Sequence, residues 1–197
     1  DQQQAPWHLF TTLESSSMDD VVARELETAR RVGLPVSAVV PVDFPYHDVS
    51  ALTTVQDQMQ INPLKYAQGL AATLKRDNLQ IFEHTRVTGI DDGDPCTVST
   101  EHGSISARNV VVATHTPKGI YAVHAEMEAR REFVLAAKLR GLLPAPGMYW
   151  HLMADQHYSV RPYSSETGDF LLALGEAYLV GSETDNESRL QALQDYL

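Results

Sequence analysis

The segment "SISARNVVVATHT", residues 104–116, combines an apolar run with the small and hydroxylated residues that end it. Three valines and an alanine over 110–113 are typical of a strand that is buried on both faces. In open α/β sheets, ligands bind outside the carboxyl ends of such strands. The end of this segment is therefore the first candidate for contact with a ligand.

Aromatic and histidine side chains are a second candidate, because binding pockets are mostly apolar and aromatic with a few polar groups. The same side chains on antiparallel strands commonly fill a core instead, and both interpretations stay open. The residues concerned are Tyr46, Trp150, His151, Tyr158 and Tyr163.

Other site chemistry is not indicated by the sequence. The eight histidines show no metal-binding spacing such as H-E-x-x-H, and the "DDGD" at 91–94 lacks the rest of a calcium loop. There is no G-x-S-x-G elbow of the kind that carries a hydrolase nucleophile. We therefore expect neither a metal site nor a hydrolase.

Composition narrows the class of protein. With 15 Lys and Arg against 26 Asp and Glu, the net charge of -11 argues against a nucleic-acid partner. No stretch approaches the roughly 18 to 20 apolar residues that span a bilayer, and no basic and apolar leader is present. The single Cys96 fits a reducing compartment. We expect a cytoplasmic protein that contacts neither membrane nor nucleic acid.

Periodicity predicts the elements that would position these residues. After a polar lead-in, a helix is expected from a Ser17 cap to Gly33, followed by short or edge strands in the proline-rich segment 34–46. A second helix is expected after an Asn62 cap, with Pro63 in its first position. Its buried face would consist of Leu64, Ala67, Ala71 and Leu74.

Strands are expected at 79–90, 96–100 and 104–114, with a tight hairpin between the last two. The segment 132–142 could be strand or helix. Further antiparallel strands are expected at 148–153, 157–163 and 169–181, and a helix from Asn186 to the end.

The succession "NPLKYAQGLAATLKRDNLQIFEHTRVTGI", "VSTEHGSISARNVVVAT" and "HYSVRPYSSETGDFLLALGE" is similar to the middle of FAD-dependent oxidoreductases of the D-amino-acid oxidase type, which include glycine oxidases. The resemblance covers residues 15–197 and is strongest over 62–114. It implies an α+β fold, with an antiparallel or mixed sheet and flanking helices. It also implies substrate-side segments at 1–61 and 118–197 around a part of the FAD domain at 62–117.

By this resemblance, the main chain of Val87 borders the adenine of FAD. Ala113 and Thr114 match the "ATG" turn near the dinucleotide, with His115 in place of the usual glycine. Arg161 is near the arginine that meets a substrate carboxylate, and a guanidinium suits that task. An exposed strand arginine is the alternative. We take Arg161 and Tyr158 as the substrate-binding candidates.

The family's opening strand, G-x-G-x-x-G loop and helix do not occur in this sequence. We therefore expect an internal piece of a larger flavoprotein, which would bind FAD weakly or not at all without the missing FAD-binding domain. Alone it is expected to be inactive.

Two hypotheses about function follow. In the first, the resemblance implies that the parent protein oxidises a small amine or amino acid by hydride transfer to the flavin. In the second, the sheet over 148–181 is a non-catalytic module that binds a ligand or a partner protein.

Overall fold

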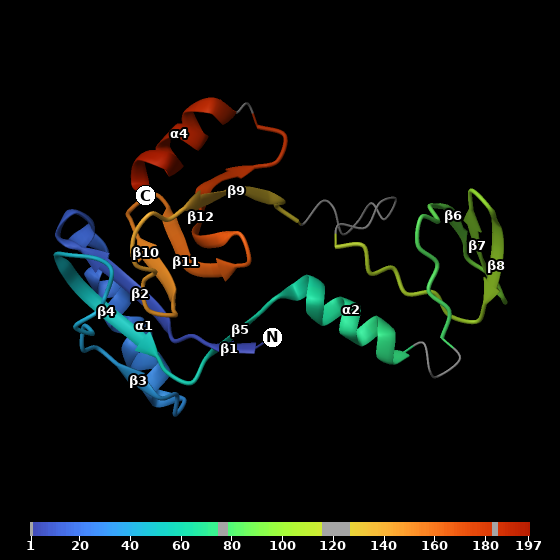
Figure 1. Ribbon diagram of the computed structural model, residues 1–197. Coiled ribbons are helices and arrows are strands. Elements are labelled where there is room, and N and C mark those ends of the chain that lie inside the picture. Colours follow the sequence, from blue (N-terminus) through green and yellow to red (C-terminus); the bar gives the residue numbers. More distant parts are fainter. Residues whose placement is uncertain (1, 75–78, 116–126, 183–184) are drawn as a thin grey trace. The chain divides into compact units, whose positions relative to one another are not determined.

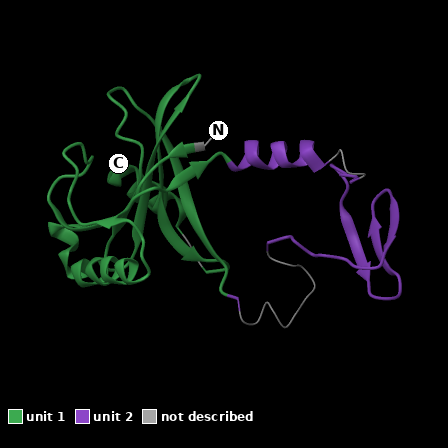
Figure 2. Ribbon diagram, turned by 90° about the horizontal axis from the view of Figure 1, so that it is seen from below, with its two compact units in different colours: residues 1–62, 128–197 green, residues 63–127 purple. Residues whose placement is uncertain are grey.

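The structure is a computed structural model that describes residues 2–74, 79–115, 127–182 and 185–197 (Figure 1). It divides into unit 1, residues 1–62 and 128–197, and unit 2, residues 63–127 (Figure 2). Helices and antiparallel or mixed sheets occur together. The expected α+β class is confirmed.

A seven-stranded sheet forms the centre of the described part of unit 1. Neighbouring strands pair antiparallel except β2 and β10, which run parallel. The strand order across the sheet is β3 (Val36–Ser37), β4 (Val49–Val55), β2 (Trp7–Thr12), β10 (Met148–Leu152), β11 (His157–Ser165), β12 (Gly168–Leu179) and β9 (Arg130–Lys138). A separate two-stranded pair joins β1 (Gln2–Gln4) to β5 (Met59–Ile61).

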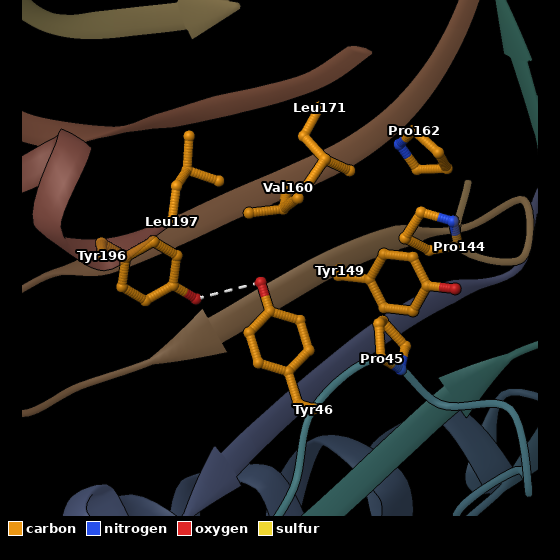
Figure 3. A pocket seen from close by; sticks show the side chains of 9 residues that line it. All are labelled: Pro45, Tyr46, Pro144, Tyr149, Val160, Pro162, Leu171, Tyr196 and Leu197. Carbon is orange, nitrogen blue, oxygen red and sulfur yellow. Dashed lines mark hydrogen bonds between the residues drawn. The ribbon is translucent and has the colours of Figure 1, made fainter. Parts of the chain in front are cut away.

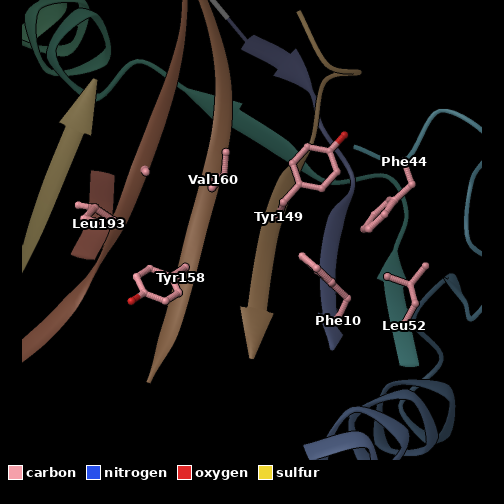
Figure 4. Close-up of a cluster of buried hydrophobic side chains, with 8 residues drawn as sticks. Phe10, Phe44, Leu52, Tyr149, Tyr158, Val160 and Leu193 are labelled. Atoms are coloured by element: carbon pink, nitrogen blue, oxygen red, sulfur yellow. The ribbon is translucent and has the colours of Figure 1, made fainter. Parts of the chain in front are cut away.

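One face of this sheet, called the core face, carries the hydrophobic core (Figure 4). Cross-strand partners place Phe10 beside Leu52, and Tyr149 beside Val160, which in turn lies beside Ala173. Leu193 of α4 (Asn186–Tyr196) packs into the same cluster and is fully buried. The helix begins at an Asp185 cap whose carboxylate accepts from the Glu187 and Ser188 N–H groups.

The helix α1 (Asp19–Arg31) lies on the other face of the sheet, over β4 and β2. Thr53 donates a hydrogen bond to the Val22 carbonyl at 2.9 Å, and Asp19 accepts hydrogen bonds from Thr11 and Ser50. The helix was expected here, but its cap was not Ser17. A 3-10 helix, η1 (Leu13–Met18), precedes α1, and Met18 takes the cap position without a side-chain hydrogen bond.

Two strands of this sheet fall where no strand was expected. The polar lead-in contains β2, and β4 follows the proline-rich segment, which itself contributes only the short edge strand β3. The ambiguous segment at 132–142 is a strand, since β9 pairs with β12 over most of its length. The expected strands β10, β11 and β12 and the helix α4 are present.

Unit 2 contains α2 (Pro63–Leu74) and a meander of β6 (Val87–Asp91), β7 (Cys96–Thr100) and β8 (Gly103–Ala107). The helix starts at Pro63 as expected, and the hairpin between β7 and β8 is present. The prediction of a strand over 79–86 was wrong, because β6 begins only at Val87.

The expected buried strand at 110–113 is also wrong. These residues form no strand, and Val111 is 86% exposed. The expected buried face of α2 is wrong as well, with Leu64 65% exposed. Both errors have one physical reason: none of the described residues of unit 2 provides a surface that covers these apolar side chains, and a buried hydrophobic core is found only in unit 1.

Candidate functional site

The face of the main sheet opposite the core is covered by α1 only over β4 and β2. Its remaining part, called the open face, lies over β10, β11, β12 and β9. One row of cross-strand partners runs from Trp150 to Ser159, Leu174 and Val134. A second row runs from Arg161 to Leu172 and Ala136. Within unit 1, α4 contacts β12 and β9, and its Leu193 is buried in the cluster on the core face.

Arg161 is the cation near the middle of the open face. Its side chain is half-buried, and it makes no hydrogen bond or ion pair with another described residue. A guanidinium presents several N–H donors in a planar fork that matches a carboxylate. A partly desolvated guanidinium without a hydrogen-bond partner among the described residues is suited to binding an anion.

Ser159 precedes Arg161 by two residues and therefore shares its face of the strand. Its side chain is only 2% exposed, and its Oγ atom has no hydrogen-bond partner among the described residues. Buried hydroxyls in native proteins are usually paired, so an unpaired one indicates a missing partner such as water or ligand.

An aromatic row crosses the open face beside Ser159. The Trp150 ring stacks on His157 with centroids 4.9 Å apart and planes 4° apart, and Trp7 lies 6.4 Å from Trp150 on the other side. His157 also contacts the Glu132 carboxylate at 3.4 Å. This row fixes the Trp150 side chain next to the strand that carries Arg161.

Tyr158 lies on the core face, opposite Arg161. It is 5% exposed, and its hydroxyl donates to Glu176 at 2.6 Å and accepts from Gln156 at 2.7 Å. Burial and the Glu176 carboxylate raise the pKa of Tyr158 to about 12. The structure therefore does not bring the two substrate-binding candidates together, and Tyr158 serves the core.

Glu176 links the sheet to α4. It occupies an irregularity in β12 with a φ of 57°, which turns its carboxylate toward Tyr158 and toward Arg189 at 3.5 Å. Arg189 also lies over the Tyr178 ring. A buried carboxylate is tolerated here because it is hydrogen-bonded and paired.

The other aromatic candidates divide between the two faces. Trp150 and the exposed Tyr163 point to the open face, whereas His151 and Tyr158 point to the core face, where Tyr46 packs against Phe10 with ring centroids 4.5 Å apart. The core interpretation therefore holds for three of these five residues.

A small pocket of about 160 Å³ opens at the edge of the core face (Figure 3). This is below the roughly 300 to 1,000 Å³ of typical ligand sites. Its tyrosine hydroxyls already have partners: Tyr196 donates to Tyr46 at 3.2 Å, and Tyr149 donates to the Ala145 carbonyl at 2.8 Å. The remaining lining residues are Pro45, Pro144, Val160, Pro162, Leu171 and Leu197. We interpret it as a gap in core packing.

A serine and a histidine meet in the core but do not form a hydrolase site. Ser15 Oγ lies 3.1 Å from His151 Nε2, and the other ring nitrogen contacts Tyr196 at 3.1 Å. Ser15 is 3% exposed, and its oxygen already accepts the Thr12 N–H as part of a helix cap. Burial lowers the pKa of His151, which disfavours its charged form. This cluster is structural.

The cofactor candidates all lie in unit 2. Val87 is 51% exposed at the start of β6, and Ala113 and Thr114 are exposed in a segment without regular structure. His115 has a φ of 64°, a left-handed conformation that glycine adopts most easily.

The cofactor candidates occupy two exposed segments, and no described pocket includes them. The described residues also hold no group of three or more His, Cys, Asp or Glu that could bind a metal. None of the described helices is long and apolar enough to cross a membrane.

Sequence reasoning missed Trp7 and Ser159. Trp7 was assigned to a lead-in, although "WHLFTT" is rich in the aromatic and β-branched residues that are typical of strands. Ser159 carries no signal of its own, but it follows from Arg161 by the two-residue period of a strand.

Comparisons with known proteins agree with this architecture. A family model described as "DAO: FAD dependent oxidoreductase" matches residues 5–197. No curated protein matches the chain. A solved structure with a similar fold is the dithionite-reduced L-alpha-glycerophosphate oxidase from Mycoplasma pneumoniae with FAD bound, at 15% identity and a TM-score of 0.71. The match covers 98% of this chain but only 56% of that one.

Proposed function

Because the chain belongs to the DAO family of FAD-dependent oxidoreductases, we propose that the protein containing it oxidises a small amine or amino acid. FAD, when bound, supplies the acceptor for the hydride that such an oxidation removes. The observation that carries the assignment to this chain is the unpaired Arg161 on the open face.

In this proposal the open face binds the substrate. The Arg161 guanidinium binds its carboxylate through paired hydrogen bonds, and the rigid strands around it fix the orientation of the bound molecule. The neighbouring Leu172 and Leu174 are half-buried and lie on the strand next to Arg161. They exclude water from one side of that contact.

Unit 2 is proposed to belong to the FAD-binding part of the protein. Its exposed apolar side chains include Leu64 on α2, Phe82 before β6, and Val111. Soluble proteins rarely leave so many large apolar residues uncovered in one region. A further FAD-binding segment would cover them and supply the phosphate-binding loop. Val87, Ala113 and Thr114 are the proposed contacts with FAD.

The test is to purify the whole protein and record its visible spectrum. Flavin absorbance that bleaches anaerobically when small amines or amino acids are added would support the proposal. A colourless protein would contradict it. Replacing Arg161 by Met should leave the flavin bound while raising the substrate concentration needed for bleaching, since the residue is proposed to bind substrate and not FAD.

A non-catalytic binding module is the second candidate. It is favoured by the exposure of Val87, Ala113 and Thr114, none of which lines the pocket described above. Calorimetric titration of the 197-residue chain with FAD distinguishes in part between the oxidoreductase and the non-catalytic module. We expect no binding in the micromolar range, because an isolated part of the cofactor site lacks the phosphate contacts.

A further inference from the structure

We propose that the open face selects a monocarboxylate that carries an aromatic group, with Arg161 binding the carboxylate and Trp150 contacting the ring. This inference rests on the proposed function and names the class of its substrate. It follows from three features of the open face: its charges, its apolar side chains, and the buried Ser159 hydroxyl, which has no hydrogen-bond partner among the described residues.

The charges on the open face favour a single anionic group. Arg161 is the cation at its centre, whereas Lys138 lies two strands away on β9. At the opposite end, His157 and Glu132 contact each other at 3.4 Å. One central cation matches one carboxylate. A dicarboxylate would place its second charge over apolar side chains, where desolvation is costly.

The neighbours of Arg161 are apolar in both directions across the sheet. Leu172 is its direct partner on β12, and Ala136 follows on β9. On the other side, Trp150 is the direct partner of Ser159, which makes it a diagonal neighbour of Arg161. Diagonal neighbours in an antiparallel pair are about 7 to 8 Å apart, within reach of aromatic and long side chains.

Trp150 makes an aromatic substituent the best match. Its ring is held in place by the stack on His157 and is half-buried rather than covered. Aromatic pairs contribute about 0.5 to 1.5 kcal/mol beyond the burial of their area. A phenyl group beside a carboxylate can therefore contact Trp150 while the carboxylate binds Arg161.

Ser159 is the cross-strand partner of Trp150 and precedes Arg161 by two residues on the same face of β11. Its hydroxyl is buried and has no hydrogen-bond acceptor among the described residues. A carboxylate bound at Arg161 would offer that acceptor on the same face of the same strand. The hydroxyl can thus donate a second hydrogen bond to an anion bound at Arg161.

The experiment is an NMR titration of the 197-residue chain with three probes: phenylacetate, acetate and benzylamine. The chain contains two tryptophans, Trp7 and Trp150, so its two indole N–H signals report directly on the aromatic row. The backbone amides of Ser159 and Leu174 are reporters that survive substitution of Trp150.

We expect phenylacetate to shift these NMR signals in a saturable way. Its Kd should be at least about tenfold lower than that of acetate, because its ring buries apolar area. Benzylamine should cause no saturable shift. Arg161→Met should abolish binding of both anions. Trp150→Leu should lower the affinity for phenylacetate to that for acetate. Lys138→Met is the matched control and should change neither Kd.

Equal affinity for phenylacetate and acetate would overturn the aromatic class and leave the proposed carboxylate site intact. Binding of neither anion, or binding that survives Arg161→Met, would overturn the inference and also remove Arg161 from the proposed substrate site. Trp150→Phe, which keeps an aromatic ring, should retain the preference if Trp150→Leu fails to fold. Loss of the preference in a folded Trp150→Phe variant would count against the inference.

Discussion

Tyr158 and Arg161 lie three residues apart on β11 and point to opposite faces of the same sheet. Tyr158 is hydrogen-bonded in the core, and Arg161 stands on the open face without a partner among the described residues. The two side chains therefore have separable roles, one in stability and one in ligand binding.

Substitutions at these two positions should separate stability from binding. Tyr158→Phe removes a donor from the buried Glu176 and should lower the free energy of unfolding by about 1 to 3 kcal/mol. Arg161→Met should change it by no more than about 0.5 kcal/mol, since it breaks no hydrogen bond or ion pair with a described residue and keeps a long apolar side chain. Urea unfolding measures both. A larger loss from Arg161→Met than from Tyr158→Phe would contradict the assignment.

Gly175 is required by the position of the Tyr158 ring. A Cβ atom at residue 175 would lie 2.3 Å from Tyr158 Cδ1, well inside contact distance. Gly175→Ala should therefore destabilise the protein by about 1 to 3 kcal/mol, the usual cost of overpacking a core. Thermal or urea unfolding measures the loss.

Gly141→Ala is the control for this substitution, because nothing lies within 4 Å of a Cβ atom at that position. It should leave the free energy of unfolding nearly unchanged. In a Tyr158→Leu background, Gly175→Ala should cost less than in the native protein. An equal cost in both backgrounds would show that the ring is not the obstacle.

His8 should make stability depend on pH. Burial lowers its pKa from 6.5 to about 4, and the nearby Asp43 carboxylate offsets only part of this lowering. Between these two values the unfolded chain binds more protons than the folded one, so stability rises with pH across this window. The contribution of neutral His8 to the free energy of unfolding is fully present above pH 6.5 and is lost as the pH falls to about 4. The loss is on the order of 3 kcal/mol.

His8→Gln removes the titration while keeping a polar group for the Thr54 hydroxyl, which His8 Nδ1 contacts at 2.9 Å. Urea midpoints measured from pH 4.5 to 7.5 should rise less steeply in this variant than in the native protein. The slope will not vanish, because burial also lowers the pKa of His151. Identical slopes in the two proteins would show that His8 is not held neutral.

Unit 2 should be less protected from hydrogen exchange than unit 1. The buried hydrophobic residues of the described chain all belong to unit 1, so local opening of β6, β7 and β8 exposes little additional apolar surface. In the 197-residue chain, their amides should exchange at least about tenfold faster than those of β10 and β11. Equal protection would indicate a core in unit 2 that the burial of its residues does not show.

Sequence patterns predicted the elements whose signals are local. The hairpin of β11 and β12 follows from the two strand-like runs on either side of the loop "SSETGD", and α2 begins at the expected Pro63. The prediction of a buried strand from the valine run at 110–113 was wrong. Burial depends on a covering surface, and a local sequence pattern does not reveal whether one is present. The opposite faces of Tyr158 and Arg161 could have been predicted, since an odd spacing on a strand always separates faces.

β2 was missed for a different reason. It is short, contains His8 and two threonines, and sits in the sheet between β4 and β10, which are distant in sequence. Its position depends on long-range pairing, including a parallel contact with β10 that no turn signal announces. The candidate site depends on the same pairing, because β2 places Trp7 beside Trp150.

The most direct test of the central claim is the anaerobic visible spectrum of the whole protein before and after adding phenylalanine, phenylglycine and their aliphatic counterparts. We expect flavin absorbance that bleaches, with aromatic compounds effective at lower concentration, and an Arg161→Met variant that keeps its colour but needs far more substrate. A purified protein without flavin absorbance, or flavin that bleaches equally well in the Arg161→Met variant, would contradict it.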